Sequence, residues 1–95
     1  MASVTVRKVS EVTTKVVTDS QSRTLNAGGY VSITIDATLS GYTPIGVVGS
    51  SLNGGVGCAV TESTIIGNDV RLIVSNLGSA SRTLQSVSAR ILYVR

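Results

Sequence analysis

Apolar and polar residues alternate strictly over residues 30–36, which read YVSITID. Val31, Ile33 and Ile35 fall on one side of an extended chain, and the residues between them fall on the other. This period of two predicts a β-strand with one buried face and one polar face.

The last predicted strand, residues 82–94, changes its pattern along its length. Four apolar residues share its first face: Val87, Ala89, Ile91 and Tyr93. The opposite face is polar at first and becomes apolar at Leu92 and Val94. A strand that is apolar on both faces near its end either lies in the centre of a sandwich or packs against a neighbouring subunit.

Residues 42–55, YTPIGVVGSSLNGG, are too apolar for an ordinary loop and too rich in glycine for an ordinary strand. Pro44 cannot donate a ladder hydrogen bond, so it belongs at the start of a strand or on an edge strand. Gly46 and Gly49 indicate bulges, or places where another chain segment approaches closely. Asn53-Gly54 is a strong hairpin signal, so residues 56–63 are predicted to return from it as the next strand.

Residues 4–18 have an ambiguous pattern. Val4 and Val6 alternate with polar residues as in a strand, whereas Val9, Val12 and Val16 continue from Val6 at helical spacing. Because these positions are almost all Val and Thr, which lose rotamer freedom in helices, we predict one or two strands or an extended arm.

The rest of the chain also predicts strands. Residues 65–66 and 70–75 are two strands joined by a tight turn at 67–69, with a polar turn at 18–22 and a loop at 76–81. Six to eight strands without a helix predict an all-β fold, an antiparallel β-sandwich of jelly-roll or another Greek-key type. We expect one compact domain, with residues 1–23 as an N-terminal arm or first strands (an attachment segment) and residues 24–95 as the sandwich.

Composition supports an all-β chain and indicates association. Apolar residues make up 42% of the 95 residues and charged residues only 14%, with no Phe or Trp. A small monomer with so many apolar and so few charged residues has difficulty covering its surface with polar groups. We therefore expect an oligomer. The net charge is +3, but the eight basic residues are scattered and no aromatic residues lie among them, so we expect no nucleic-acid binding.

The chain offers little for catalysis. It has no histidine, its five carboxylates are far apart in sequence, and no glycine-rich phosphate loop is present. The single cysteine, Cys58, follows Gly57 and is expected to be a small buried residue. We therefore expect no enzyme, no metal and no cofactor. No segment resembles a signal peptide or a membrane span, so synthesis in the cytoplasm without membrane insertion is expected.

Polar residues at the predicted loop tips are the weak ligand-binding candidates. These are Asn26, Asn53, Asn68, Asp69 and Asn76. Each of the three tyrosines is expected to cap the core or an interface with its ring, rather than to stack on a ligand.

Four segments together resemble a known class of module. AGGYVSITID, GYTPIGVVGSSL, GNDVRLIVSNLGSAS and the terminal ARILYVR are similar to the C-terminal β-sandwich head modules of tail-fibre, baseplate and related virion structural proteins of bacteriophages and prophages. The resemblance covers residues 24–95. It implies a homotrimeric virion component, associated with other virion proteins, whose distal loops contact a saccharide or a protein on the host cell surface.

Two functions follow from this resemblance. The first is the host-receptor-binding head of a tail fibre or baseplate. The alternative is a purely structural virion component, such as a head fibre, a capsid decoration protein or a tail-joining protein, with no receptor binding. The absence of shoulder and stalk domains and the scarcity of aromatic residues favour the second function, and the resemblance favours the first.

Overall fold

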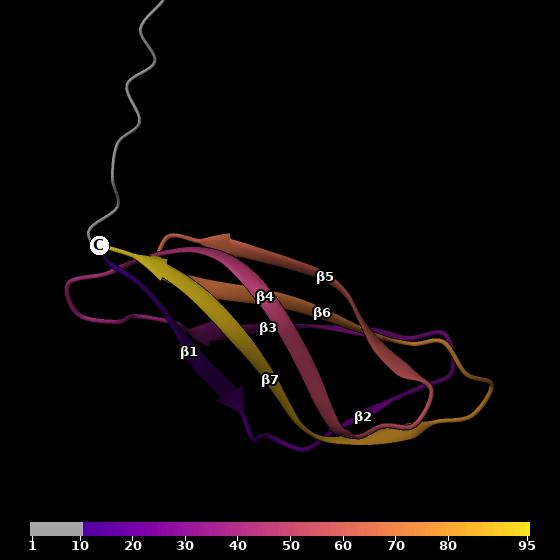
Figure 1. The fold of residues 1–95 in the computed structure, drawn as a ribbon. Helices are drawn as coiled ribbons and strands as arrows, with labels where there is room; N and C mark the ends of the chain where they lie inside the picture. Colours follow the sequence, from indigo (N-terminus) through magenta and orange to yellow (C-terminus); the bar gives the residue numbers. More distant parts are fainter. Residues whose placement is uncertain (1–10) are drawn as a thin grey trace, which may run out of the picture.

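The computed structural model describes residues 11–95, in which seven strands form two antiparallel sheets packed as a sandwich (Figure 1). Sheet A holds β1 (Val12–Asp19), β2 (Arg23–Leu25), β4 (Thr43–Gly54) and β7 (Arg82–Val94). Sheet B holds β3 (Tyr30–Asp36), β5 (Cys58–Ile66) and β6 (Asp69–Asn76). The described residues contain no helix, so the predicted fold class is confirmed.

The strands pair in a nested order. In sheet A, β7 lies in the centre, with β1 and β2 along one edge and β4 along the other. In sheet B, β6 lies in the centre between β3 and β5. The first strand thus pairs with the last and the third with the sixth, while the chain crosses repeatedly from one sheet to the other. This pairing makes an antiparallel sandwich of two sheets, and the choice between a jelly roll and another Greek-key sandwich stays a prediction.

The alternating patterns of the central strands build the core. In β7, the four residues of the predicted apolar face are all buried, and so are the matching positions of β6: Val87, Ala89, Ile91, Tyr93, Val70, Leu72 and Val74. From β3, Ile33 and Ile35 complete this layer. Each large apolar side chain buried here contributes about 1.5–3 kcal/mol relative to an exposed one. The central position of β7 also explains why Leu92 and Val94, on its second face, are half-buried.

Tyr93 ties the two sheets together. Its ring is buried in the core, and its hydroxyl donates a hydrogen bond of 2.5 Å to the carbonyl oxygen of Ala37, just after β3. Burial raises the pKa of the Tyr93 hydroxyl, so the group stays a donor.

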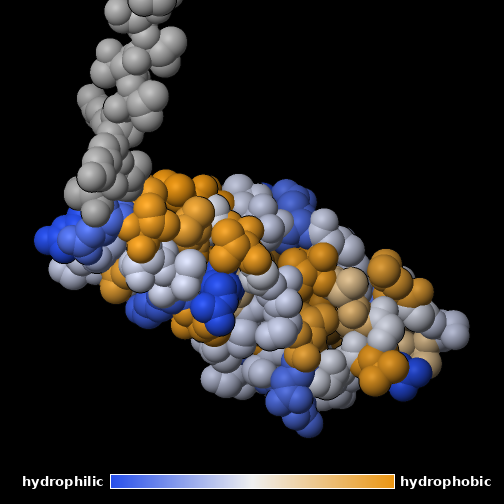
Figure 2. All heavy atoms as spheres, in the orientation of Figure 1, coloured by the Kyte–Doolittle hydropathy of each residue, from blue (hydrophilic) through white to orange (hydrophobic). Residues whose placement is uncertain are grey.

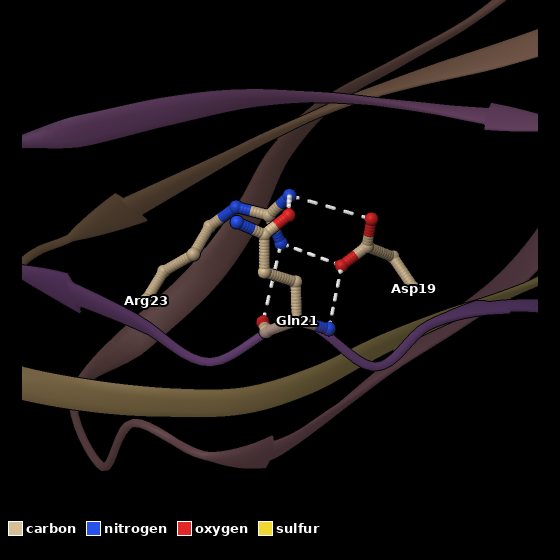
Figure 3. A network of polar contacts seen from close by, with 3 residues as sticks. All are labelled: Asp19, Gln21 and Arg23. Atoms are coloured by element: carbon tan, nitrogen blue, oxygen red, sulfur yellow. Dashed lines mark hydrogen bonds and ion pairs between the residues drawn. The ribbon is translucent and has the colours of Figure 1, made fainter.

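A polar network closes the gap between β1 and β2 (Figure 3). The guanidinium of Arg23 donates to both carboxylate oxygens of Asp19, at 2.6 and 3.3 Å, and also to the backbone and side-chain oxygens of Gln21. The backbone N–H of Gln21 donates to Asp19 as well, at 3.1 Å. Asp19 ends β1 and Arg23 begins β2, so the network joins the two strands across residues 20–22, and both strands pair in succession with the same edge of β7.

β4 is an irregular edge strand, as its glycines and proline predict. Pro44 is its second residue, and β4 pairs with β7 alone. Two bulges follow, in which Ile45 and Val48 are the additional residues. The space where a Cβ of Gly46 or Gly49 would lie is open, so the alternative of a close approach by another segment of the described chain is wrong.

The predicted hairpin at Asn53-Gly54 is wrong. β4 continues through both residues with a third bulge between them, and the turn follows at residues 55–58, where Cys58 N–H donates to the Gly55 carbonyl at 2.8 Å. β5 then enters sheet B, so β4 and β5 do not pair. Residues 58–66 form one strand and not two, whereas the turn after Ile66 is a two-residue hairpin with Gly67 at φ +61°, close to the prediction.

For residues 1–23 the sequence predicted either an arm or first strands, and the structure describes the part from Glu11 onward. Val12–Asp19 is a full strand of sheet A, so this part of residues 1–23 belongs to the sandwich as a first strand and is not a separate arm. Residues 1–10 lie outside the described residues.

Candidate binding surface

The loops gather at two opposite ends of the sandwich. One end, which we name the loop end, carries residues 26–29, 55–57 and 77–81. The other end, the terminal end, carries residues 37–42 and the turn at 67–68, together with the beginning of β1 and the end of β7. In Figure 1 the C-terminus marks the terminal end and the loop end lies at the opposite side of the view.

Backbone hydrogen bonds join the three segments of the loop end. Gly28 N–H donates to the Asn76 carbonyl at 3.0 Å, and Asn76 N–H donates to the Gly29 carbonyl at 2.8 Å. Leu77 N–H donates to the Gly57 carbonyl at 3.0 Å. The segments therefore form one connected surface, although they are far apart in the sequence.

Asn76 fixes the base of this surface. Its side chain is fully buried, and its amide nitrogen donates to the carbonyls of Leu25 and Ala80 at 3.1 and 2.8 Å. Its amide oxygen accepts from Gly78 N–H at 3.0 Å. Asn76 was predicted as an exposed ligand residue, but the structure buries it and engages both ends of its amide within the chain. Continuing the alternation of β6 from Val70 by steps of two would have placed residue 76 on the buried face.

The most exposed large apolar side chains lie at the loop end. Val56, Tyr30 and Leu77 are 78%, 72% and 71% exposed, whereas the other exposed large apolar residues range from 49% to 59%. Val56 lies in the 55–57 turn, Leu77 opens the 77–81 loop, and Tyr30 begins β3 opposite Ser75. Figure 2 shows apolar surface at this end of the molecule. These residues were not predicted as site residues, because alternation identifies buried positions and says little about loops.

The polar site candidates do not converge. Asn26 is exposed at the loop end, where its side-chain oxygen accepts from Ser81 Oγ at 3.4 Å, and Asn53 is exposed near the end of β4, on the same side. Asn68 and Asp69 are exposed at the terminal end, where the Asn68 carbonyl accepts from Ala37 N–H. The five residues are therefore divided between the two ends.

The three tyrosines have three different environments. Tyr93 is in the core, and Tyr30 is exposed at the loop end. Tyr42, at the terminal end, donates its hydroxyl to the carboxylate of Glu11, while the Arg95 guanidinium lies 5.4 Å from the centre of its ring. Arg95 also pairs with Glu11 at 3.5 Å. This cluster fastens the beginning of β1 to the end of β7.

Other features of residues 11–95 bear on possible ligand sites. No group of three or more Cys, Asp or Glu side chains in this range is placed to hold a metal ion. A shallow hollow of about 250 Å³ on the outer face of sheet A has Arg90 as its one titratable residue. Cys58 is half-buried against the core rather than fully buried as predicted. No helix in the described range has the length and apolarity needed to cross a membrane.

Comparisons of the chain with models of known protein families, with curated proteins and with solved structures each yield no match. Function is therefore inferred from the geometry of the chain itself.

Proposed function

We propose that the chain is a non-enzymatic binding module, which serves as the host-receptor-binding head of a bacteriophage tail fibre or baseplate. The observation that carries this proposal is the position of Val56, Tyr30 and Leu77. The three most exposed large apolar side chains of the described chain all lie at the loop end, opposite the terminal end.

Exposed apolar side chains at one end of a module are suited to a protein partner. Exposed apolar side chains are unfavourable in water, so covering them with a partner contributes favourable free energy in proportion to the apolar area buried. The loops that carry them are held by backbone bonds and by Asn76, so little conformational entropy is lost on binding. A module attached through its terminal end would present the loop end outward.

The same surface is less suited to a saccharide. Sugar sites commonly use stacking on aromatic rings, and Tyr30 is the one aromatic residue at the loop end. We therefore propose a host-surface protein as the receptor.

The apolar character of the loop end also supports a second function. If its partner is another virion protein, the chain is a structural component, such as a head fibre, a capsid decoration protein or a tail-joining protein. The two functions share the surface and differ in the partner.

Binding of the labelled protein to intact bacterial cells tests the proposal. The variant Val56→Ser/Leu77→Ser removes two apolar side chains of the loop end, and Ile66→Ser removes one from the terminal end, where Ile66 is also exposed. We expect the double variant to bind at least tenfold more weakly, a loss of about 1.4 kcal/mol, and Ile66→Ser to bind like the unchanged protein.

Three outcomes would argue against a receptor-binding loop end. Equal weakening by Ile66→Ser would show that the surface is not the one proposed. Unchanged binding of the double variant would also show that the loop end is not the binding surface. Binding to purified virions, but to no cells, would replace the receptor function with the structural one.

A further inference from the structure

The outer face of sheet A is apolar toward the terminal end. Pairing with β7 places three rows of residues across β1, β7 and β4 on this face: Val12, Val94 and Thr43; Thr14, Leu92 and Gly46; Val16, Arg90 and Gly49. Toward the loop end the rows become small and polar, with Thr18, Ser88 and Ser51. Figure 2 shows apolar side chains gathered on the face that β1, β4 and β7 present to the viewer.

The two bulges of β4 add a ridge to this face. Ile45 and Gly46 together oppose Leu92, and Val48 and Gly49 together oppose Arg90. Ile45 and Val48 are 52% and 53% exposed, so the residues that the bulges insert are large, apolar and solvent-facing. Nothing in the fold of the single chain requires large apolar residues at these two positions.

A hollow lies beside the ridge. Because Gly49 has no side chain and the space above it is open, a depression of about 250 Å³ forms there, lined by Val16, Ser51, Ser88 and Arg90 among others. The face thus carries a projection and a depression next to each other along β4, because Val48 and Gly49 are consecutive residues.

The face has almost no charge. Among the described residues, Arg90 is the one charged residue in the four rows from Val12 to Ser51. Its guanidinium bonds the Thr14 hydroxyl at 3.3 Å and lies between the apolar and the hydroxyl-rich halves of the face. An isolated cation does not attract an acidic partner strongly, and the facing hydroxyl groups of a second copy would supply acceptors for it when covered.

The size of the face fits a small protein interface. β1 pairs with the eight residues Val87–Val94 of β7, so at about 3.4 Å per residue and about 4.8 Å between strands the three-strand face measures roughly 27 Å by 14 Å, or about 380 Å² as a flat sheet. Side chains make the accessible area larger than this, and a standard interface buries about 800 Å² on each partner.

We infer that the outer face of sheet A is the surface through which copies of this chain associate, with the Ile45–Val48 ridge of one copy seated in the hollow over Gly49 of another. A symmetric contact requires a surface that complements itself, and a ridge and a hollow on one face provide this complementarity. The inference does not depend on the proposed function, because the loop end lies outside the contact and stays exposed in the assembly.

Light scattering coupled to size exclusion tests the inference with three single variants. Ile45→Asp places a charge on the ridge. Gly49→Leu fills the hollow, and a Cβ at this position meets no atom within 4 Å. Ile66→Asp is the matched control, because Ile66 is 50% exposed on sheet B, almost the same as Ile45. Circular dichroism checks that each variant keeps the β-sandwich.

We expect the unchanged protein to have a mass of two chains, because a self-complementary face pairs with one other copy, and the same mass for Ile66→Asp. Ile45→Asp and Gly49→Leu should each weaken association at least tenfold and elute as folded monomers at low concentration. A monomeric unchanged protein at about 100 µM, a concentration far above a Kd of about 1 µM, would overturn the inference. Unchanged association of both face variants, or equal dissociation by Ile66→Asp, would also overturn it.

Discussion

Asn76 shows how a single polar residue can be placed in an apolar core. It continues the buried face of β6 beyond Val74, and it is the one buried polar residue within the described range. Its amide satisfies two carbonyls and one N–H of the loops around it. A buried amide with these partners is a structural group, since any ligand would have to displace bonds that hold the loop end together.

We predict that Asn76→Ala lowers the free energy of unfolding by about 2–3 kcal/mol, because it leaves Gly78 N–H and the two carbonyls without their buried partner. Urea denaturation measures the change. Asn53→Ala is the matched control, since Asn53 is exposed, and its change should stay within about 0.5 kcal/mol. Equal effects of the two substitutions would show that the Asn76 bonds contribute little.

At the scale of the elements, the end of β4 depends on one backbone conformation. Gly54 has φ +78°, and a Cβ at this position would lie 2.9 Å from the Thr83 carbonyl oxygen of β7. Gly67, in the β5–β6 hairpin, also has a positive φ, of +61°, but no atom lies within 4 Å of its Cβ position. A side chain at Gly67 would therefore meet backbone strain alone, whereas one at Gly54 would meet both backbone strain and steric overlap.

We predict that Gly67→Ala destabilises the fold by about 1–2 kcal/mol, which is the cost of the left-handed conformation for a residue with a side chain. Gly54→Ala should cost clearly more, because the Thr83 backbone must also move. Thermal and urea unfolding of the two variants under the same conditions measure the difference. A cost for Gly54→Ala no larger than that for Gly67→Ala would contradict the predicted overlap.

The sequence predicted the strands well where alternation is regular. β3 and β7 have the predicted bounds and buried faces, because a period of two is a direct consequence of one-sided burial. The Asn53-Gly54 signal misled because turn chemistry is local. It indicates a change of direction, but it does not determine whether the next strand pairs in the same sheet.

The candidate site was predicted less well than the fold. Its polar candidates were chosen for their residue type, and the structure divides them between two ends and buries Asn76. The grouping of Val56, Tyr30 and Leu77 depends on how the loops of two sheets meet, and this depends on a strand order that the sequence left open. The sequence could have predicted only the burial of Asn76, because residue 76 falls on the buried face when the alternation of β6 is continued.

At the scale of the whole molecule, the inner sheet faces, the outer face of sheet A and the loop end are different regions with different proposed roles. The two inner faces form the core, the outer face of sheet A is proposed for self-association, and the loop end is proposed for the partner. Because the loop end lies at the end of the sandwich and not on a sheet face, both surfaces can be occupied at once. Loss of binding and loss of association can therefore be measured independently in the variants described above.

Acid stability is a property of the whole molecule that two aspartates should control. The hydrogen bonds from Arg23 hold the pKa of the Asp19 carboxyl below its usual range, and those from the Thr38 hydroxyl and N–H do the same for Asp36. The unfolded chain lacks these bonds, so its aspartates titrate near pH 3.9. As the pH falls through this value, the unfolded state binds protons before the folded state does, and stability falls.

We therefore predict that the free energy of unfolding is nearly constant above about pH 5 and decreases as the pH falls below about 4, until both folded carboxyls are protonated. Urea denaturation across this range measures the slope. Asp19→Asn should make the decrease shallower, and Arg23→Gln should do the same, because either change removes the bond that lowers the pKa of Asp19. The decrease of the unfolding free energy with pH should be no shallower in the double variant than in Asp19→Asn alone, since the two residues act through one interaction. A full acid slope in Asp19→Asn would show that other groups control the acid stability of the sandwich.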